Sequence, residues 1–229
     1  MKTILRNIVI ILTYLTSIPF LRRLFLTKPL LRVWCLHEVK DSQIGELEKK
    51  IQYLQKEYNI ITPTQFKDRE LFKDKVNVLI TFDDGFESWF TNVLPVLAKY
   101  NLKALFFVNH GFLEKSERLT EQGHSLGGHS YSHKRLTELS GQDLEAEVKR
   151  SVMSEFFAYP FGDRRSFNEE VIDQIKQAGF KYAFNILPGF NTEKTNPYLL
   201  HRDSLDPDVP DYIFRLWLKG SYDWVKMLF

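Results

Sequence analysis

Short apolar segments alternate with amphipathic segments along most of this chain, and this alternation limits its fold more than any other feature. Apolar runs typical of buried strands are expected to form strands at 31–37, 77–82, 103–109, 155–159 and 181–186. Apolar residues at helical spacing predict helices at 44–58, 90–97, 142–152 and 168–179. Strands that alternate with helices indicate an α/β fold with a parallel sheet or a βα barrel. In such folds the functional side chains lie at the carboxyl ends of the strands.

The composition supports a single globular domain and removes several classes of protein. The chain has 229 residues, of which 44% are apolar and 26% charged, so it is long and apolar enough to bury a full core. Its net charge of +2 is too small to indicate a nucleic-acid partner. Cys35 is the single cysteine, which excludes an internal disulfide and a four-cysteine zinc site.

Two adjacent carboxylates, Asp83 and Asp84, follow a strongly apolar predicted strand in the stretch VLITFDDGF. Like charges repel each other, and a carboxylate removed from water must be paired or bound to a cation. The Asp-Gly step alone is a common turn signal and indicates no function. The adjacent pair therefore predicts a positively charged partner at the end of this strand.

A second stretch, GGHSYSHKRL, supplies further metal-binding groups. His129 and His133 are four residues apart, and on a helical turn both side chains would lie on one face and reach one ion. Two histidines and one carboxylate form a three-ligand zinc site that leaves a position open for water. One aspartate would bind the metal, while its neighbour, pointing elsewhere along an extended segment, would accept a proton. This donor set favours zinc, and other divalent first-row metals also fit it.

Three motifs together resemble one known family. The motifs TFDDG, HSYSH and AYPFG resemble, in this order, the first three motifs of the NodB-homology polysaccharide deacetylases, which are carbohydrate esterase family 4. The resemblance covers roughly residues 31–205. It implies a distorted (β/α)7 barrel. It also implies a metal-dependent hydrolase that removes N-acetyl groups from the amino sugars of a polysaccharide. The apolar ends of the chain extend this expectation to a lipid-linked glycan.

The resemblance assigns roles to the residues at matching positions. Asp83 matches the general base of the family, and the implied metal ligands are Asp84, His129 and His133. Ser130 matches the residue that braces the histidine loop. The implied aromatic wall of the substrate groove consists of Tyr159, Pro160 and Phe161. A backbone N–H near Tyr159 is implied as a donor to the oxyanion of the transition state.

The third motif departs from the usual family pattern. Ala158 stands where most members have an arginine that orients the base. The run FAYP resembles a subgroup, the poly-N-acetylglucosamine deacetylases, in which an early histidine acts as general acid and a late arginine is present. This similarity predicts His37 as the general acid and Arg202 as the replacement for the missing arginine. His201 is the rival acid, because it follows two leucines as the usual late motif does.

Other functions stay open at this point. The connection between His133 and Ala158 is short for the family, which is also compatible with a degenerate domain that binds glycan without cutting it. An amidase that acts on a small non-sugar amide would use the same residues. A retaining glycosidase fits less well, because adjacent carboxylates on one strand end rarely lie on opposite sides of one bond.

The two ends of the chain suggest a membrane surface as a partner. Residues 1–30 contain an uncharged apolar stretch at 7–21 that is flanked by basic residues and is shorter than the ~20 residues needed to span a bilayer. An interfacial helix or anchor, a signal peptide or signal-anchor, and a buried core helix all fit it. Residues 206–229 form an aromatic, basic segment that suits either a membrane interface or a last helix packed on the barrel. The expectation is a membrane-associated protein, on either face, with its catalytic domain at 31–205.

Overall fold

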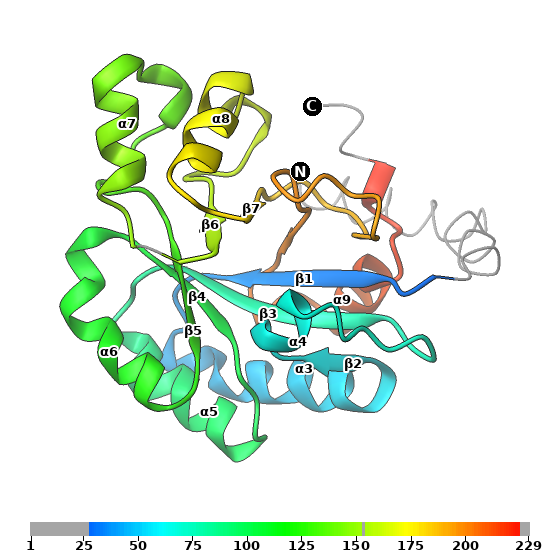
Figure 1. The fold of residues 1–229 in the computed structure, drawn as a ribbon. Coiled ribbons are helices and arrows are strands. Elements are labelled where there is room, and N and C mark those ends of the chain that lie inside the picture. Colours follow the sequence, from blue (N-terminus) through cyan, green and yellow to red (C-terminus); the bar gives the residue numbers. More distant parts are fainter. Residues whose placement is uncertain (1–27, 153, 225–229) are drawn as a thin grey trace, which may run out of the picture.

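The computed structural model describes residues 28–152 and 154–224, and within them one parallel sheet organises the chain (Figure 1). Its strands are β1 (Leu31–Leu36), β2 (Asn59–Ile61), β3 (Asn77–Asp84), β4 (Leu105–Val108), β5 (Ser125–Gly128), β6 (Phe156–Ala158), β7 (Tyr182–Phe184) and β8 (Asp203–Ser204). Their order in the sheet is β7-β6-β5-β4-β3-β1-β8, and β2 pairs with the first half of β3. All these strand pairs are parallel, so the carboxyl ends meet at one edge of a curled half-barrel.

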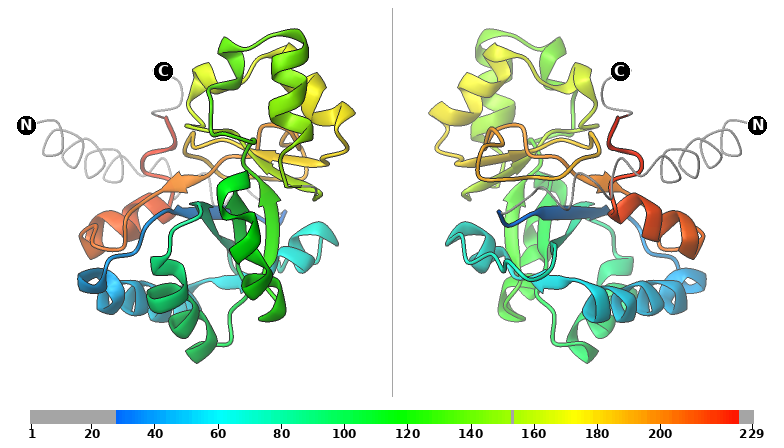
Figure 2. Two further views of the ribbon diagram at one scale, coloured as in Figure 1. Left: turned by 90° about the vertical axis from the view of Figure 1, so that its left-hand side faces the viewer. Right: turned by 90° about the vertical axis from the view of Figure 1, so that its right-hand side faces the viewer.

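Helices connect the strands and cover the outside of the curled sheet. They are α3 (Ile44–Glu57), α4 (Pro63–Lys67), α5 (Leu94–Lys99), α6 (Leu113–Glu121), α7 (Gly141–Lys149), α8 (Glu169–Gln177) and α9 (Asp211–Leu218). Figure 1 shows α7 and α8 beside each other, and Figure 2 shows α9 next to α3 on the outer side of the sheet. Apolar residues of α3, α5 and α9 pack there against the outward side chains of β1, β3 and β4.

The strands and helices predicted from periodicity are present, and the elements missed are short except for the nine-residue α6. The missed strands are β2, β5 and β8, and the missed helices are α4 and α6. Two glycines in β5 and the two-residue length of β8 leave no apolar run to recognise. The strand predicted at 181–186 is therefore not the last one, because β8 follows it and pairs with β1.

The two faces of the strands differ in chemistry. On the concave face, Val33, Leu79 and Leu105 belong to one apolar cluster at the base of the barrel. Because side chains alternate along a strand, Cys35 and Asp83 continue these rows toward the carboxyl ends. Buried polar groups thus lie above an apolar floor, at the edge where α/β folds place their functional sites.

The described part of the predicted C-terminal tail belongs to the barrel. In α9 the side chains of Ile213, Phe214 and Trp217 are buried in the main core, so they are not free to enter a membrane interface. Composition alone could not separate these two possibilities, because both need an apolar, aromatic helix face. Among residues 28–152 and 154–224, no helix is both long and apolar enough to cross a bilayer. The predicted N-terminal membrane segment at 7–21 lies outside the described residues.

Candidate active site

The aspartate pair lies at the carboxyl end of β3, and a sharp backbone turn separates the two side chains. Asp84 has a φ of 84° and Gly85 a φ of 94°. The alternation of an extended segment therefore does not explain how the pair separates, because Asp84 has left the extended conformation. Gly85 is needed at this turn, since a Cβ atom there would lie 2.5 Å from the ring of Phe112.

Asp83 is bound by the arginine that the sequence predicts for it. Arg202 Nη1 donates to Asp83 Oδ1 over 2.6 Å, and Nη2 donates to Oδ2 over 2.7 Å. Arg202 Nε donates to the carbonyl of Asn185 over 3.0 Å, which fixes the plane of the guanidinium. Both partners of the pair are buried, at 1% and 0% exposure. The bidentate geometry leaves Asp83 a single orientation at the barrel mouth.

The surroundings of Asp83 keep it ionised. Burial opposes the charged form, but the Arg202 guanidinium outweighs it and holds the pKa of Asp83 below its usual value. Beneath it, burial raises the pKa of the Cys35 thiol well above its ordinary value, so the thiol stays protonated. Its S–H group donates to Asp83 Oδ2 over 3.5 Å. A carboxylate that is charged and oriented at the carboxyl edge of a sheet is suited to accept a proton.

The three predicted metal ligands converge on one point. Nε2 of His129 lies 3.2 Å from Asp84 Oδ1, and Nε2 of His133 lies 3.1 Å from the same oxygen. His129 is buried, and its Nδ1 lies 2.8 Å from the carbonyl of Ala158, so Nδ1 carries a proton.

This arrangement fits a divalent metal ion. With Nδ1 protonated, a neutral His129 presents the lone pair of Nε2 to a carboxylate oxygen, and two acceptors cannot bond to each other. Oδ1 of Asp84 is buried and has no well-directed hydrogen-bond donor among the described residues. Two ligand atoms about 2.0–2.1 Å from a tetrahedral zinc ion would lie about 3.3 Å apart, close to the distances present here. The second possible cluster, of Cys35, His37 and Asp83, fits less well, because Asp83 is already paired and Cys35 keeps its proton.

The two histidines come together on a loop, so the predicted helical turn is wrong. Residues 129–135 have no helical structure, and both Ser130 and His133 have a φ of 58°. The Ser130 hydroxyl oxygen accepts the His133 N–H over 2.9 Å, which is the bracing role predicted for this serine. Residues with positive φ persist where the surrounding contacts leave no alternative, and such positions gather at functional sites.

Glu147 of α7 holds the same loop, and the sequence analysis missed it. Its Oε2 accepts the Ser132 N–H over 2.9 Å, and its backbone carbonyl accepts the Tyr131 N–H over 2.9 Å. The residue is 7% exposed and lies in the buried stripe of α7, beside Leu144 and Val148. A carboxylate inside an apolar helix stripe was the available signal, because it must have a buried partner.

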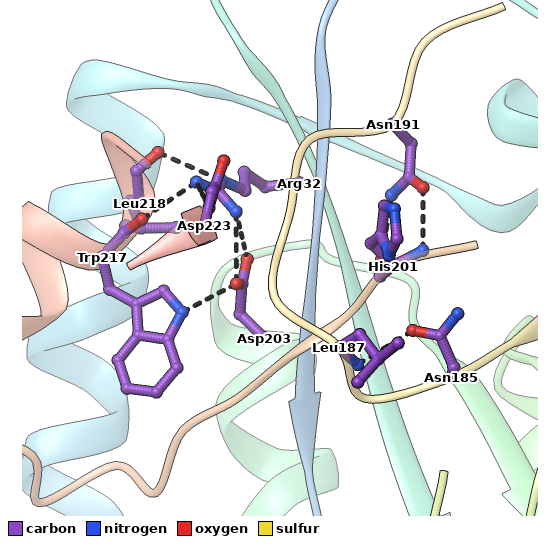
Figure 3. Close-up of polar contacts among 9 residues, drawn as sticks. All are labelled: Arg32, Asn185, Leu187, Asn191, His201, Asp203, Trp217, Leu218 and Asp223. Carbon is purple, nitrogen blue, oxygen red and sulfur yellow. Dashed lines mark hydrogen bonds and ion pairs between the residues drawn. The ribbon is translucent and has the colours of Figure 1, made fainter. Parts of the chain in front are cut away.

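The structure places the two candidate acids differently. A ring nitrogen of His37, just beyond β1, lies within 4.8 Å of a carboxylate oxygen of Asp83. His201 lies just before β8, and its backbone N–H and carbonyl bond to the side chain of Asn191 over 2.8 and 2.9 Å (Figure 3). Neighbouring residues of an extended segment point opposite ways, and Arg202 takes the side that faces Asp83. The geometry thus favours His37, while its role as acid stays a prediction.

Of the three residues predicted to form the aromatic wall, Phe161 alone is exposed. Phe161 is 49% exposed and contacts the ring of His133, with 5.0 Å between the ring centroids. Tyr159, just after β6, is fully buried against the outer helices, and its hydroxyl donates to the carbonyl of Tyr198 over 2.8 Å. Pro160 is also buried. The N–H of Tyr159 donates to the carbonyl of Phe184, so this amide is not the predicted oxyanion donor.

Comparison with known proteins identifies the domain. Residues 72–183 match the family model described as polysaccharide deacetylase. The peptidoglycan-N-acetylmuramic acid deacetylase PdaA of Bacillus subtilis (strain 168) is 26% identical over 164 residues, which cover 66% of this chain and 59% of PdaA. The chain therefore contains a polysaccharide deacetylase domain of the NodB type. It spans between 46% and 59% of the length of the first curated relatives that it matches.

Solved structures have the same fold. The Streptococcus pyogenes deacetylase PplD, solved in complex with acetate, has a TM-score of 0.68 at 18% identity, covering 82% of this chain and 96% of PplD. IcaB from Ammonifex degensii has a TM-score of 0.67 at 21% identity, covering 84% of this chain and 96% of IcaB. The curled parallel sheet is thus the distorted (β/α)7 barrel of the NodB type.

Proposed function

We propose that this protein is a metal-dependent hydrolase that removes N-acetyl groups from the amino sugars of a cell-envelope polysaccharide. One observation carries the proposal: the ionised, oriented Asp83 lies beside a separate group of two imidazoles and one carboxylate that fits a divalent ion. The match to the polysaccharide deacetylase family and the glycan named for its relative PdaA support the substrate class.

The residues of the chain divide the reaction between them. Asp83, held by Arg202, accepts a proton from the attacking water, and its low pKa keeps it in the accepting form at neutral pH. His37 then donates a proton to the leaving amine, because a free amide nitrogen is a poor leaving group. Phe161 offers an exposed aromatic surface for the apolar face of the sugar. The products are acetate and an amino sugar with a free amine.

The metal would be held by Asp84, His129 and His133, and we propose zinc from this donor set. When bound, such an ion polarises the acetyl carbonyl and lowers the pKa of a coordinated water toward ~7. The chain prepares the site through Ser130 and Glu147, which fix the histidine loop, and through the carbonyl of Ala158, which fixes the tautomer of His129.

Two finer assignments also belong to the proposal. The placement of His37 and Arg202 around Asp83 supports a relationship with the poly-N-acetylglucosamine deacetylase subgroup. The apolar stretch at 7–21, flanked by basic residues, supports attachment to a membrane surface, with a polymer or a lipid-linked glycan as substrate.

Acetate release from N-acetylglucosamine oligomers tests the proposed function. The purified protein is assayed with zinc and with a chelator, beside Asp83→Asn, and bound zinc is measured for each sample. We expect release that requires zinc and disappears in Asp83→Asn, although this variant still binds one zinc ion. Tight zinc binding without release from any acetylated glycan would instead favour a small amide as substrate. Sugar binding without zinc binding or release would favour a glycan-binding module.

A further inference from the structure

The loop that carries His37 is held by two side chains from a different segment. Residues 37–40 have no regular structure. The indole Nε1–H of Trp89 donates to the carbonyl of His37 over 2.9 Å. The side-chain amide of Asn92 donates to the carbonyl of Val39 over 2.8 Å and to Asp41 Oδ1 over 2.9 Å. The backbone after β1 is thereby tied to one short helical segment.

That segment is a π-helical turn, Trp89–Val93, which begins a few residues after Asp83 and Asp84. The N–H of Leu94 bonds to the carbonyl of Trp89, five residues earlier, so the turn is wider than an α-helical one. Such turns are rare and frequently occur at functional sites. Here the turn follows the end of β3, which carries the aspartates, and its side chains bond to the segment after β1, which carries His37.

The indole of Trp89 is rigidly placed. Trp89 is fully buried, and its ring contacts those of Phe82, Phe106 and Phe112 with centroid distances of 6.0, 5.0 and 5.2 Å. A side chain packed this closely cannot change rotamer without opening the core. Its N–H group therefore holds the His37 carbonyl in one position. This matters for catalysis, because a misplacement of about 1 Å at a catalytic group can cost about 100-fold in rate.

We propose that Trp89 is a positioning residue, which sets the distance between His37 and Asp83 through its hydrogen bond to the His37 carbonyl. The proposal rests on the proposed function, with His37 as the acid that protonates the leaving amine. It predicts a selective defect: reactions whose leaving group needs a proton depend on Trp89, and reactions whose leaving group needs none do not.

The test compares Trp89→Phe, which keeps an aromatic ring and loses the N–H, with the matched control Trp34→Phe. Trp34 is equally buried in the same core, and its indole donates to the carbonyl of Leu205 over 2.9 Å instead of to that of His37. Each zinc-loaded variant is assayed on N-acetylglucosamine oligomers and on 4-nitrophenyl acetate, whose phenolate leaves without protonation. Both substitutions are also made in a His37→Ala background.

We expect Trp89→Phe to lower acetate release from the sugar about tenfold while ester hydrolysis changes less than about twofold. Trp34→Phe should change neither rate by more than about twofold. In the His37→Ala background, Trp89→Phe should not lower the rate of acetate release from the sugar any further, because the two residues act as one unit. Equal losses on both substrates, or an effect that persists without His37, would overturn the proposal.

If Trp89→Phe does not fold, Asn92→Leu is measured in the same assays. The proposal that this turn positions His37 then requires that Asn92→Leu lowers acetate release from the sugar and leaves ester hydrolysis nearly unchanged. If the parent protein releases no acetate from any sugar, the proposed function fails. A crystal structure of Trp89→Phe then decides the positioning claim, which is overturned if His37 keeps its place beside Asp83.

Discussion

The guanidinium of Arg202 holds both carboxylate oxygens of Asp83, with contacts of 2.6 and 2.7 Å between residues 119 positions apart in the chain. Neither partner is more than 1% exposed. A buried pair of this kind is costly to break from one side, because the remaining charge has lost both its water and its partner. The relationship therefore couples the stability of the fold to the orientation of the proposed base.

Replacement of Arg202 should affect both stability and activity. Arg202→Met leaves the Asp83 charge buried and unpaired, so we expect a loss of ~3–5 kcal/mol in the free energy of unfolding, measured with urea. Arg202→Lys keeps the charge but loses the bidentate contact, and turnover should fall ~100-fold with a smaller loss of stability. Arg32→Lys is the control, since Arg32 is equally buried and bound to a carboxylate on the outer face. It should lower stability and leave turnover nearly unchanged, and an equal loss of turnover there would argue against a specific role of Arg202.

His37→Ala and His201→Ala separate the two candidate acids. We expect His37→Ala to lower turnover of the acetylated sugar ~100-fold to 10,000-fold, the range for general acid–base groups, because its ring lies beside Asp83. His201→Ala should stay within a few-fold of the parent, since the contacts that fix its backbone to Asn191 remain available. Steady-state rates of acetate release decide the matter. A loss confined to His201→Ala would reverse the assignment.

Glu147→Ala should weaken metal binding without removing a ligand. The substitution deletes the carboxylate that holds Ser132 and leaves the loop between His129 and His133 less constrained. Loss of such supporting contacts typically costs 10-fold to 100-fold in metal affinity, and we expect a rise of ~10-fold to 100-fold in the zinc dissociation constant. Competition with a chromophoric chelator measures it. Glu145→Ala, on the exposed face of the same helix, should bind zinc as the parent does.

The buried cluster around Arg32 should make stability depend on pH. Arg32 contacts both Asp203 and Asp223, and the Trp217 indole also donates to Asp203 (Figure 3). Burial raises the pKa of Asp203 to about 7 against the opposing charge of Arg32, and Asp223 adds to the rise. Because the pKa is higher in the folded state than the ~3.9 of an unfolded chain, this contribution to stability is largest below about pH 4 and is lost as the pH rises through about 7.

Asp223→Asn tests this dependence. The asparagine oxygen can still accept from Arg32, but the second buried carboxylate is gone, so the rise in the pKa of Asp203 should shrink. We expect the urea midpoint of the parent to fall more between pH 5 and pH 8 than that of Asp223→Asn. The exposed Asp208→Asn is the control and should follow the parent. Identical pH profiles for all three proteins would contradict the prediction.

Local patterns in the sequence predicted much of the fold and the residues that form the candidate metal site. Apolar periodicity located β1, β3, β4 and α3 because these elements bury continuous rows of side chains. It missed β5, whose glycines carry no apolar side chain. The adjacent charges of Asp83 and Asp84 indicated a cation, since charge and burial conflict wherever they occur.

Conformation and long-range contact were decided only by the tertiary structure. The spacing of His129 and His133 fits a helical turn as well as the loop that is present, because spacing does not specify φ. The motif around Tyr159 does not reveal that its ring faces the outer helices, because the face is set by the register of β6 in the sheet. The apolar stripe of α7 indicated that Glu147 needs a buried partner but not which one, and no local pattern linked Trp89 to the His37 carbonyl.

By itself the sequence determined an α/β chain with a carboxylate pair, two spaced histidines and a distant arginine. The family resemblance implied that Arg202 serves Asp83 and that the two histidines join Asp84, and only the tertiary structure established these contacts. The physical reason is that residue type sets which charges need partners, whereas the pairing depends on how the parallel strands bring their carboxyl ends to one edge.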